Sequence, residues 1–468
     1  MSVSFFRRLG GSPSVISGNS GTGPGNTGPG KRAAGGRRDL LAAGAAVVFF
    51  AAVAAVGAAV QRADGTLHVS WPPLLATWMP HVGPGTPAAL AVAALVVGYG
   101  PTVAELLSWR LLLGSAWAAA AAWTCSLALV DGWQRGIAGR LTTRHEYVPA
   151  VPRFHQLLPA LHTFTQHIVG GRPGYWPAHV AGHPPGAVLT FVLLDRVGLG
   201  GGGWAGMFCV VTGSSVAAAA LVCLRALGTE RTARRAAPFL VLTPAAVWVG
   251  ASGDGYFAGV AAWALALLAL AATRRGWGPA AAAIGSGLLF GLAVHLSYGL
   301  TLIALPALAV LVCARTARPL PYVLGAAGAV TALFVACGFR WWSAYPLLVE
   351  RYYQGVGGVR PYSYWLFGDP ATVVAAAGLA SVAGAARLVR RPCGEHRAVV
   401  LLGWAFLLAI AAADLSGMSK AETERIWLPF TLWLPATAVL LPRRDVRGWL
   451  AAQAVVALLL NHLLLTGW

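Results

Sequence analysis

Uncharged runs of membrane-spanning length recur along this chain, and they constrain its fold more than any other feature. Residues 255–273 and 449–468 contain no Asp, Glu, Lys or Arg. A run of about 20 apolar residues is long enough to cross a bilayer as a helix. Of the 468 residues, 57% are hydrophobic and 10% are charged, which is too few charges to cover several water-facing domains. We therefore predict an all-α, polytopic transmembrane helical bundle, and exclude a soluble enzyme and a secreted disulfide scaffold.

The net charge of +19 comes from short arginine clusters that lie between the apolar runs. This distribution is typical of cytoplasmic loops rather than of a nucleic-acid-binding surface, so no nucleic acid partner is expected. Placing the clusters in the cytoplasm predicts a multi-pass plasma-membrane protein whose N-terminus is cytoplasmic. Ten of the fifteen acidic residues then fall on the outer side, although they were not used to set the orientation. About thirteen spans result, at residues 40–60, 87–103, 111–130, 203–224, 237–252, 255–273, 279–298, 299–314, 320–338, 369–386, 398–414, 426–442 and 448–467.

Four segments follow from this layout. Residues 1–38 are rich in Gly, Ser and Pro and predict a disordered basic cytoplasmic tail, and residues 39–110 predict two transmembrane helices. Residues 111–338 form the core with a large outer loop at 131–203, and residues 339–468 combine an outer loop with the C-terminal helices. Within the first outer loop, residues 184–199 are apolar but contain Asp195 and Arg196, so we expect a short helix on the outer surface.

Cysteine and lysine usage adds two further inferences. The six cysteines are scattered without a CxxC or Cys/His spacing, which predicts neither a disulfide framework nor a zinc site. Abundant Ala and Gly, with arginine strongly preferred over lysine, indicate a GC-rich genome, and we expect a bacterial source.

Chemistry-bearing residues collect in the segments assigned to the outer side. Ionisable groups at a membrane edge are energetically costly, so their presence there needs a reason. The first outer loop is also dense in Trp, Tyr, His and Pro, unlike a linker. The motifs are Val130-Asp131-Gly132-Trp133, Arg144-His145-Glu146-Tyr147, Gly174-Tyr175-Trp176-Pro177-Ala178-His179, Gly182-His183-Pro184-Pro185, Ser252-Gly253-Asp254 and Lys420-Ala421-Glu422-Thr423-Glu424-Arg425-Ile426-Trp427-Leu428-Pro429.

In order and sidedness, these motifs resemble the GT-C glycosyltransferases, in particular the protein mannosyltransferase and aminoarabinose transferase branch. The resemblance covers roughly residues 111–442. It implies transfer of a hexose or pentose from a polyprenyl-phosphate carrier to a glycan, lipid or protein acceptor of the cell envelope, with inversion at the sugar. It also implies an acidic base in the first outer loop, at Asp131 or Glu146. The sequence departs from the family where Gly132 replaces a second acid and Ile426 replaces a tyrosine.

The chemistry of the residues agrees with these roles. A guanidinium can hold a leaving phosphate by paired hydrogen bonds, which suits Arg425 with Lys420 as its helper. A carboxylate can remove the proton of an acceptor hydroxyl. His179, His183, Asp254, Tyr175 and Trp176 are candidates for substrate binding. No metal-ligand spacing is present, although Asp131 with a nearby acid is a candidate for holding Mg²⁺ or Mn²⁺.

Each of these residues also has a purely structural interpretation. Asp254 could cap the following helix, and His183 could simply precede a helix that starts at Pro184. Arg425, Trp and Tyr could be anchors at the membrane interface. At the level of the whole protein, the alternatives are a transporter or flippase of a lipid-linked or amphipathic anion, and an inactive scaffold.

Overall fold

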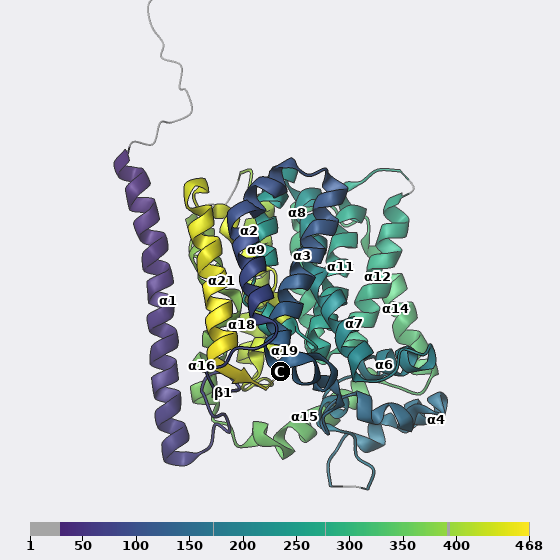
Figure 1. Ribbon diagram of the computed structural model, residues 1–468. Helices are drawn as coiled ribbons and strands as arrows, with labels where there is room; N and C mark the ends of the chain where they lie inside the picture. Colours follow the sequence, from purple (N-terminus) through teal and green to yellow (C-terminus); the bar gives the residue numbers. More distant parts are fainter. Residues whose placement is uncertain (1–28, 172, 277, 391–393, 468) are drawn as a thin grey trace, which may run out of the picture.

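The computed structural model describes residues 29–171, 173–276, 278–390 and 394–467. Long helices run side by side, and short helices and loops gather at one end of the bundle, the lower end in Figure 1. We call this the loop end. The helices of the first half are α1 Pro29–Asp64, α2 Thr86–Leu106, α3 Trp109–Ala128, α4 Leu157–His162, α5 Ala178–Gly182, α6 Gly186–Arg196, α7 Gly202–Ser214, α8 Val216–Leu227, α9 Glu230–Val241 and α10 Ala246–Val249. Those of the second half are α11 Gly253–Thr273, α12 Gly278–Leu296, α13 Ala304–Ala314, α14 Leu320–Ala336, α15 Trp341–Gln354, α16 Tyr362–Ala377, α17 Leu379–Ala385, α18 Arg397–Leu415, α19 Thr423–Ile426, α20 Leu428–Thr431 and α21 Val446–Leu463.

The predicted helical membrane bundle is confirmed, but the count of thirteen spans is not. In the described part of the chain, eight helices are long and apolar enough to cross a membrane, or up to ten if each of two bent pairs is one span. The shortfall arises where the chain breaks. Residues 237–252 contain the end of α9 and the short α10, and residues 426–442 divide into short helical turns. Residues 299–314, also predicted as a span, form a 3₁₀ turn followed by α13, which has only 11 residues. Hydrophobicity predicted these segments, because they are buried in the bundle, but it does not reveal breaks in a helix.

Small residues let the central helices approach each other closely, which explains the abundance of Gly and Ala. A Cβ on Gly259 of α11 would lie 2.4 Å from the Thr212 carbonyl oxygen of α7. A Cβ on Gly287 of α12 would lie equally close to the Val323 carbonyl oxygen of α14. Backbone contact of this kind is how helices associate in lipid, where apolar side chains gain little from leaving the bilayer.

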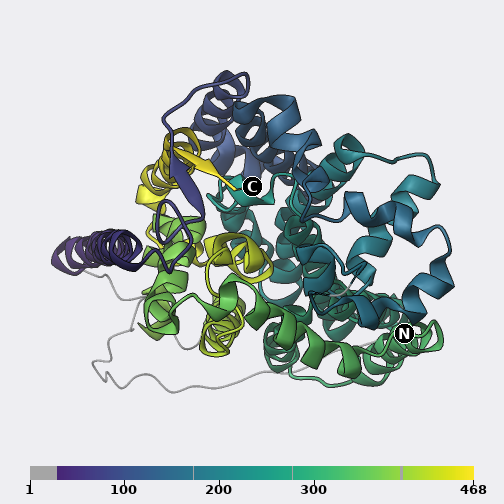
Figure 2. The same cartoon turned by 90° about the horizontal axis from the view of Figure 1, so that it is seen from below.

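The N-terminal region differs from its prediction. Helix α1 begins at Pro29, so residues 29–38, expected to be disordered, are helical, while residues 1–28 lie outside the described residues. Figure 2 shows α1 at the edge of the bundle. The Arg387 guanidinium binds Asp39 of α1 with a 2.7 Å ion pair. After α1, strand β1 (Ala76–Trp78) pairs antiparallel with β2 (Leu464–Thr466), which brings the α1–α2 loop and the end of the described chain together.

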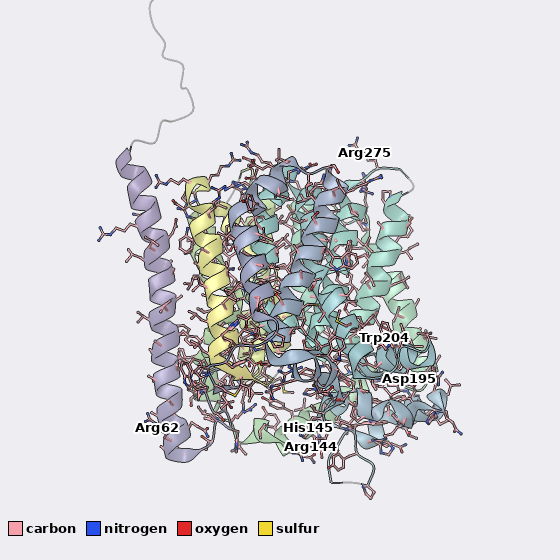
Figure 3. The ribbon with its side chains drawn as sticks, in the orientation of Figure 1. Arg62, Arg144, His145, Asp195, Trp204 and Arg275 are labelled. Carbon is pink, nitrogen blue, oxygen red and sulfur yellow. The ribbon has the colours of Figure 1, made fainter. Side chains whose placement is uncertain are left out.

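The loop end contains the predicted outer segments. The expected surface helix at residues 184–199 is α6, which has 11 residues and is too short to span a bilayer. Helix α15 turns by 74° from α14. Arg62, Arg144 and His145 lie at the loop end, whereas Arg275 lies at the opposite end (Figure 3).

Candidate functional site

A buried ion pair between Asp254 and Arg425 forms the centre of the candidate site. The Ser252 hydroxyl caps α11 by accepting a hydrogen bond from the Gly255 amide, so Asp254 lies in the first turn and is not the cap. Arg425 lies on the single turn of α19, 171 residues further along the chain, and its Nη1 donates to Asp254 Oδ2. Their side chains are 3% and 4% exposed. A buried charge pair is stable only when both partners are present, so each fixes the other's position.

A second carboxylate, Glu422, approaches Arg425 from the solvent side. Arg425 Nη2 donates to Glu422 Oε2 over 3.1 Å, and the Glu422 side chain is 24% exposed. Burial alone would raise the pKa of Glu422, but the charges of Arg425, His179 and Arg360 outweigh it and lower that pKa. Glu422 is therefore ionised at neutral pH.

Glu146 and His179 pair beside this centre. Glu146 Oε1 lies 2.7 Å from His179 Nδ1, and the Glu146 side chain is 4% exposed. Its other oxygen, Oε2, is buried and has no hydrogen-bond partner among the described residues. The His179 amide donates to the His145 carbonyl, which fixes α5 against the segment that carries Glu146. One oxygen of Glu146 thus faces His179, and the other remains available for a further hydrogen bond.

His183 and Tyr147 connect the two pairs. His183 Nδ1 lies 2.8 Å from the His179 carbonyl oxygen and 3.1 Å from the Tyr147 hydroxyl. Because a carbonyl oxygen can only accept, Nδ1 carries the proton. Burial lowers the pKa of His183 to about 4, so the ring is neutral at pH 7. Burial first, and then the charges of Asp254 and Glu146, raise the pKa of Tyr147 well above its ordinary value, so both acids lie near this ring.

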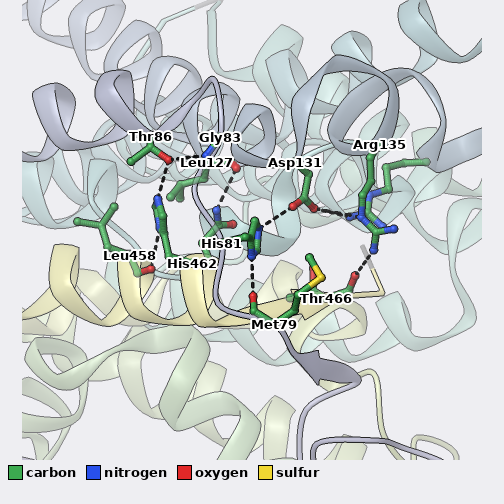
Figure 4. Close-up of polar contacts among 12 residues, drawn as sticks. Met79, His81, Gly83, Thr86, Leu127, Asp131, Arg135, Leu458, His462 and Thr466 are labelled. Atoms are coloured by element: carbon green, nitrogen blue, oxygen red, sulfur yellow. Dashed lines mark hydrogen bonds and ion pairs between the residues drawn. The ribbon is translucent and has the colours of Figure 1, made fainter.

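Asp131 lies in a neighbouring cluster (Figure 4). Its carboxylate contacts His81 Nε2 at 2.9 Å, Arg135 Nε at 3.5 Å and Arg140 Nη2 at 3.2 Å. Arg140 lies between the two clusters, because the charges of both Asp131 and Glu146 act to raise its pKa. Burial has the larger effect and lowers that pKa to about 10. The structure therefore brings Glu146, His179, His183, Asp254 and Arg425 together. It leaves Asp131 beside them, in contact with two arginines and a histidine.

The residue after Asp131 explains the missing second acid. Gly132 has φ 77° and ψ 172°. This region of backbone conformation is accessible essentially to glycine alone. An acidic residue at this position would strain the turn that leads from α3 into the loop.

A divalent cation does not fit at Asp131. Three cationic or potentially cationic groups already face its two oxygens. Among the residues that the structure describes, no three His, Cys, Asp or Glu side chains gather as a metal site would require.

Lys420 binds the segment that follows α15. Its ammonium donates to the Gly357 carbonyl over 2.9 Å and lies 5.5 Å from the centre of the Tyr353 ring. The second guanidinium near Glu422 is instead Arg360, at 3.9 Å. Arg360 lies in the turn between α15 and α16 and belongs to no motif. From the sequence, its position in the late outer loop suggests only that it could line an acceptor groove, not that it contacts Glu422.

The two aromatic candidates of the first outer loop, Trp176 and Tyr175, differ in their exposure to solvent. Trp176 is 2% exposed, stacks on Phe154 and Phe164, and carries the Arg153 guanidinium 3.6 Å from its ring centre. Both of its ring faces are thus engaged by protein side chains, which makes Trp176 part of the packed core of the loop end. Tyr175 is 50% exposed and lies 5.2 Å from the Arg351 guanidinium.

We expect Trp176→Ala to destabilise the protein by about 3–5 kcal/mol, because it removes a large buried ring from a packed core. Tyr175→Ala should change stability by less than about 1 kcal/mol, since the ring is half exposed. Thermal unfolding in detergent measures both. Equal effects of the two substitutions would contradict the packing described here.

Glu424, next to Arg425, makes stability depend on pH. Its side chain is buried, its Oε1 accepts from the Leu75 amide over 3.1 Å, and burial raises its pKa to about 7. A carboxyl with a raised folded-state pKa stabilises the fold fully below about pH 4.5 and loses that contribution as the pH rises through 7.

Glu424→Gln should therefore match the wild type near pH 4.5 and be more stable above pH 8, by roughly 3 kcal/mol. Unfolding temperatures across pH 4.5–9 test this, with the exposed Glu350→Gln as the control. A difference between wild type and Glu424→Gln that does not change with pH would refute the assignment.

A separate cavity of about 310 Å³ lies between the 3₁₀ segment Val148–Phe154 and α6. Most of the side chains that line it are apolar, but Asp195 and Arg196 also line it. None of Glu146, His179, Asp254, Glu422 and Arg425 does. The stacked rings of Tyr147 and Phe191, 5.3 Å apart, connect its wall to the candidate site.

No protein-family model matches the sequence, and no curated protein matches it either. Among solved structures, ArnT from Cupriavidus metallidurans in the apo state aligns with a TM-score of 0.42 and 15% identity, over 68% of this chain and 59% of that one. The Archaeoglobus fulgidus oligosaccharyltransferase in complex with Zn and sulfate aligns with a TM-score of 0.45 and 14% identity, over 74% of this chain and 53% of that one. The chain thus spans less than two thirds of the length of either structure.

Proposed function

We propose that this protein is a membrane glycosyltransferase that moves a sugar from a polyprenyl-phosphate donor to a hydroxyl of a glycan, lipid or protein acceptor. The observation that carries the proposal is the meeting of Glu146, Asp254 and Arg425 at one end of an apolar bundle. They come from three distant segments of the chain, and all are buried. Ionisable groups are seldom buried together without a functional reason.

Arg425 is the proposed phosphate-binding residue. Asp254 holds one side of its guanidinium, which leaves Nη2 directed toward the more exposed Glu422. As the bond between the sugar C1 and the phosphate oxygen breaks, the phosphate leaves with the electron pair, and its growing charge strengthens the hydrogen bonds from the guanidinium.

Glu146 is the proposed base. The acceptor hydroxyl oxygen forms the new bond to C1, and its proton passes to Glu146 Oε2, the oxygen that has no partner in the described structure. His179 orients the other oxygen. The products are a glycoside and a polyprenyl phosphate. Asp131 is the weaker candidate because Arg135, Arg140 and His81 already engage it.

The loop end is the proposed extracytoplasmic face. Arg231, Arg234 and Arg443 line an open cavity at the opposite end of the bundle, together with Glu105 and Glu230. An excess of arginine is typical of cytoplasmic surfaces. A transporter would favour charged groups at the bundle's midplane, whereas the paired charges here lie near helix ends.

Purified protein in nanodiscs, supplied with polyprenyl-phosphate hexoses and pentoses and with envelope extracts as acceptor, tests the proposal. We expect polyprenyl phosphate to be released together with glycosylated product, both resolved by chromatography. Movement of intact donor across a vesicle membrane without cleavage would instead support the transporter.

A further inference from the structure

The backbone that presents Glu422 is held in an unusual conformation. Ala421 and Glu422 are consecutive non-glycine residues with φ 70° and φ 64°. Side chains with a Cβ avoid this left-handed region unless surrounding contacts impose it, and such residues gather at functional sites.

Contacts on both sides impose that conformation. Asp369 Oδ1 accepts from the Ala421 amide and from the Thr423 hydroxyl, each over 3.2 Å. Arg360 Nη1 donates to the Lys420 carbonyl over 2.7 Å. The turn is thus fixed from inside the protein, while the Glu422 side chain remains partly exposed, at 24%.

The charges around Glu422 are those that an anion would need. Arg425 Nη2 lies 3.1 Å and Arg360 Nη1 3.9 Å from its carboxylate oxygens. Both guanidinium side chains are almost fully buried, at 4% and 6% exposure, and so is Asp254, at 3%. Of these four charged side chains, Glu422 is the most exposed, at 24%. It is therefore the one that an incoming ligand can displace.

We propose that Glu422 is a placeholder: its carboxylate occupies the position of the donor's phosphate, which displaces it from Arg425 and Arg360. This inference rests on the proposed function. Without substrate, Glu422 compensates two buried guanidinium groups, and uncompensated buried charge would be costly. When the phosphate binds, it takes over both partners. Glu422 then sets a threshold that favours ligands with a full negative charge over neutral lipids.

Binding of farnesyl phosphate to the full chain in detergent, measured by isothermal titration calorimetry, tests this. Glu422→Gln removes the competing charge, and Glu422→Gly removes the side chain while suiting the positive φ. Both should bind farnesyl phosphate about tenfold more tightly than the wild type, because a charged competitor for the guanidinium groups is gone. Binding of farnesol, which has no phosphate, should not change.

Ala421→Gly is the matched control, because it relieves the backbone strain at residue 421 and keeps the Glu422 carboxylate. It should leave farnesyl phosphate affinity unchanged. If the wild type binds farnesyl phosphate and both Glu422 variants bind it equally well or more weakly, the placeholder is refuted and the proposed function stands. If neither the wild type nor the variants bind it, both proposals fail.

Discussion

Replacing Arg425 by glutamine should lower the rate of sugar transfer by about 10²–10³-fold, the loss found when one preorganised donor to a developing charge is removed. The guanidinium is the most deeply buried cationic group of the site and has Asp254 and Glu422 on two sides. Release of polyprenyl phosphate per folded protein measures the effect. Arg425→Lys should restore little activity, because an ammonium cannot make the paired contact.

Folding must be separated from catalysis in this experiment. Arg425→Gln leaves Asp254 buried without its partner, which costs about 3–5 kcal/mol in comparable pairs. The double variant Asp254→Asn/Arg425→Gln removes both charges and should unfold at nearly the wild-type temperature while remaining inactive. A double variant that folds and transfers sugar at the wild-type rate would contradict the role of this pair.

Glu146→Gln should lower transfer by about 10²–10⁴-fold, the usual contribution of a positioned general base. The amide keeps the shape of the side chain but cannot take the acceptor's proton. The same assay applies, run at saturating donor so that binding of the phosphate does not limit the rate.

Asp131→Asn is the paired comparison for Glu146→Gln. It should lower stability by about 1–3 kcal/mol, since it removes the acceptor of a charged network, and leave the rate per folded protein within about threefold of the wild type. A large loss of rate in Asp131→Asn together with a small loss in Glu146→Gln would show that Asp131, and not Glu146, is the base.

The helical bundle, and the expectation that the site residues lie on one side of the membrane, follow from local features of the sequence. Long uncharged runs predicted the bundle because lipid requires apolar, internally hydrogen-bonded helices. Placing the arginine clusters in the cytoplasm also predicted that Glu146, His183, Asp254 and Arg425 lie on the same side. That prediction needs only the distribution of charge between apolar runs, not knowledge of side-chain contacts.

The remaining features depend on contacts between distant segments, which no local pattern encodes. Asp131 looked like a free acid after a span, but His81 from the α1–α2 loop binds it. Trp176 looked like a sugar platform, yet Phe154 and Phe164 enclose it. Arg360 reaches Glu422 from a turn 62 residues away and carries no motif.

A structure of the protein in nanodiscs with bound polyprenyl phosphate, determined by electron cryomicroscopy, tests the central claim most directly. We predict phosphate density within about 2.7–3.2 Å of Arg425, with the Glu422 side chain moved aside and Glu146 facing the adjoining space. Phosphate density at the opposite end of the bundle, or in the lipid away from Arg425, would contradict it.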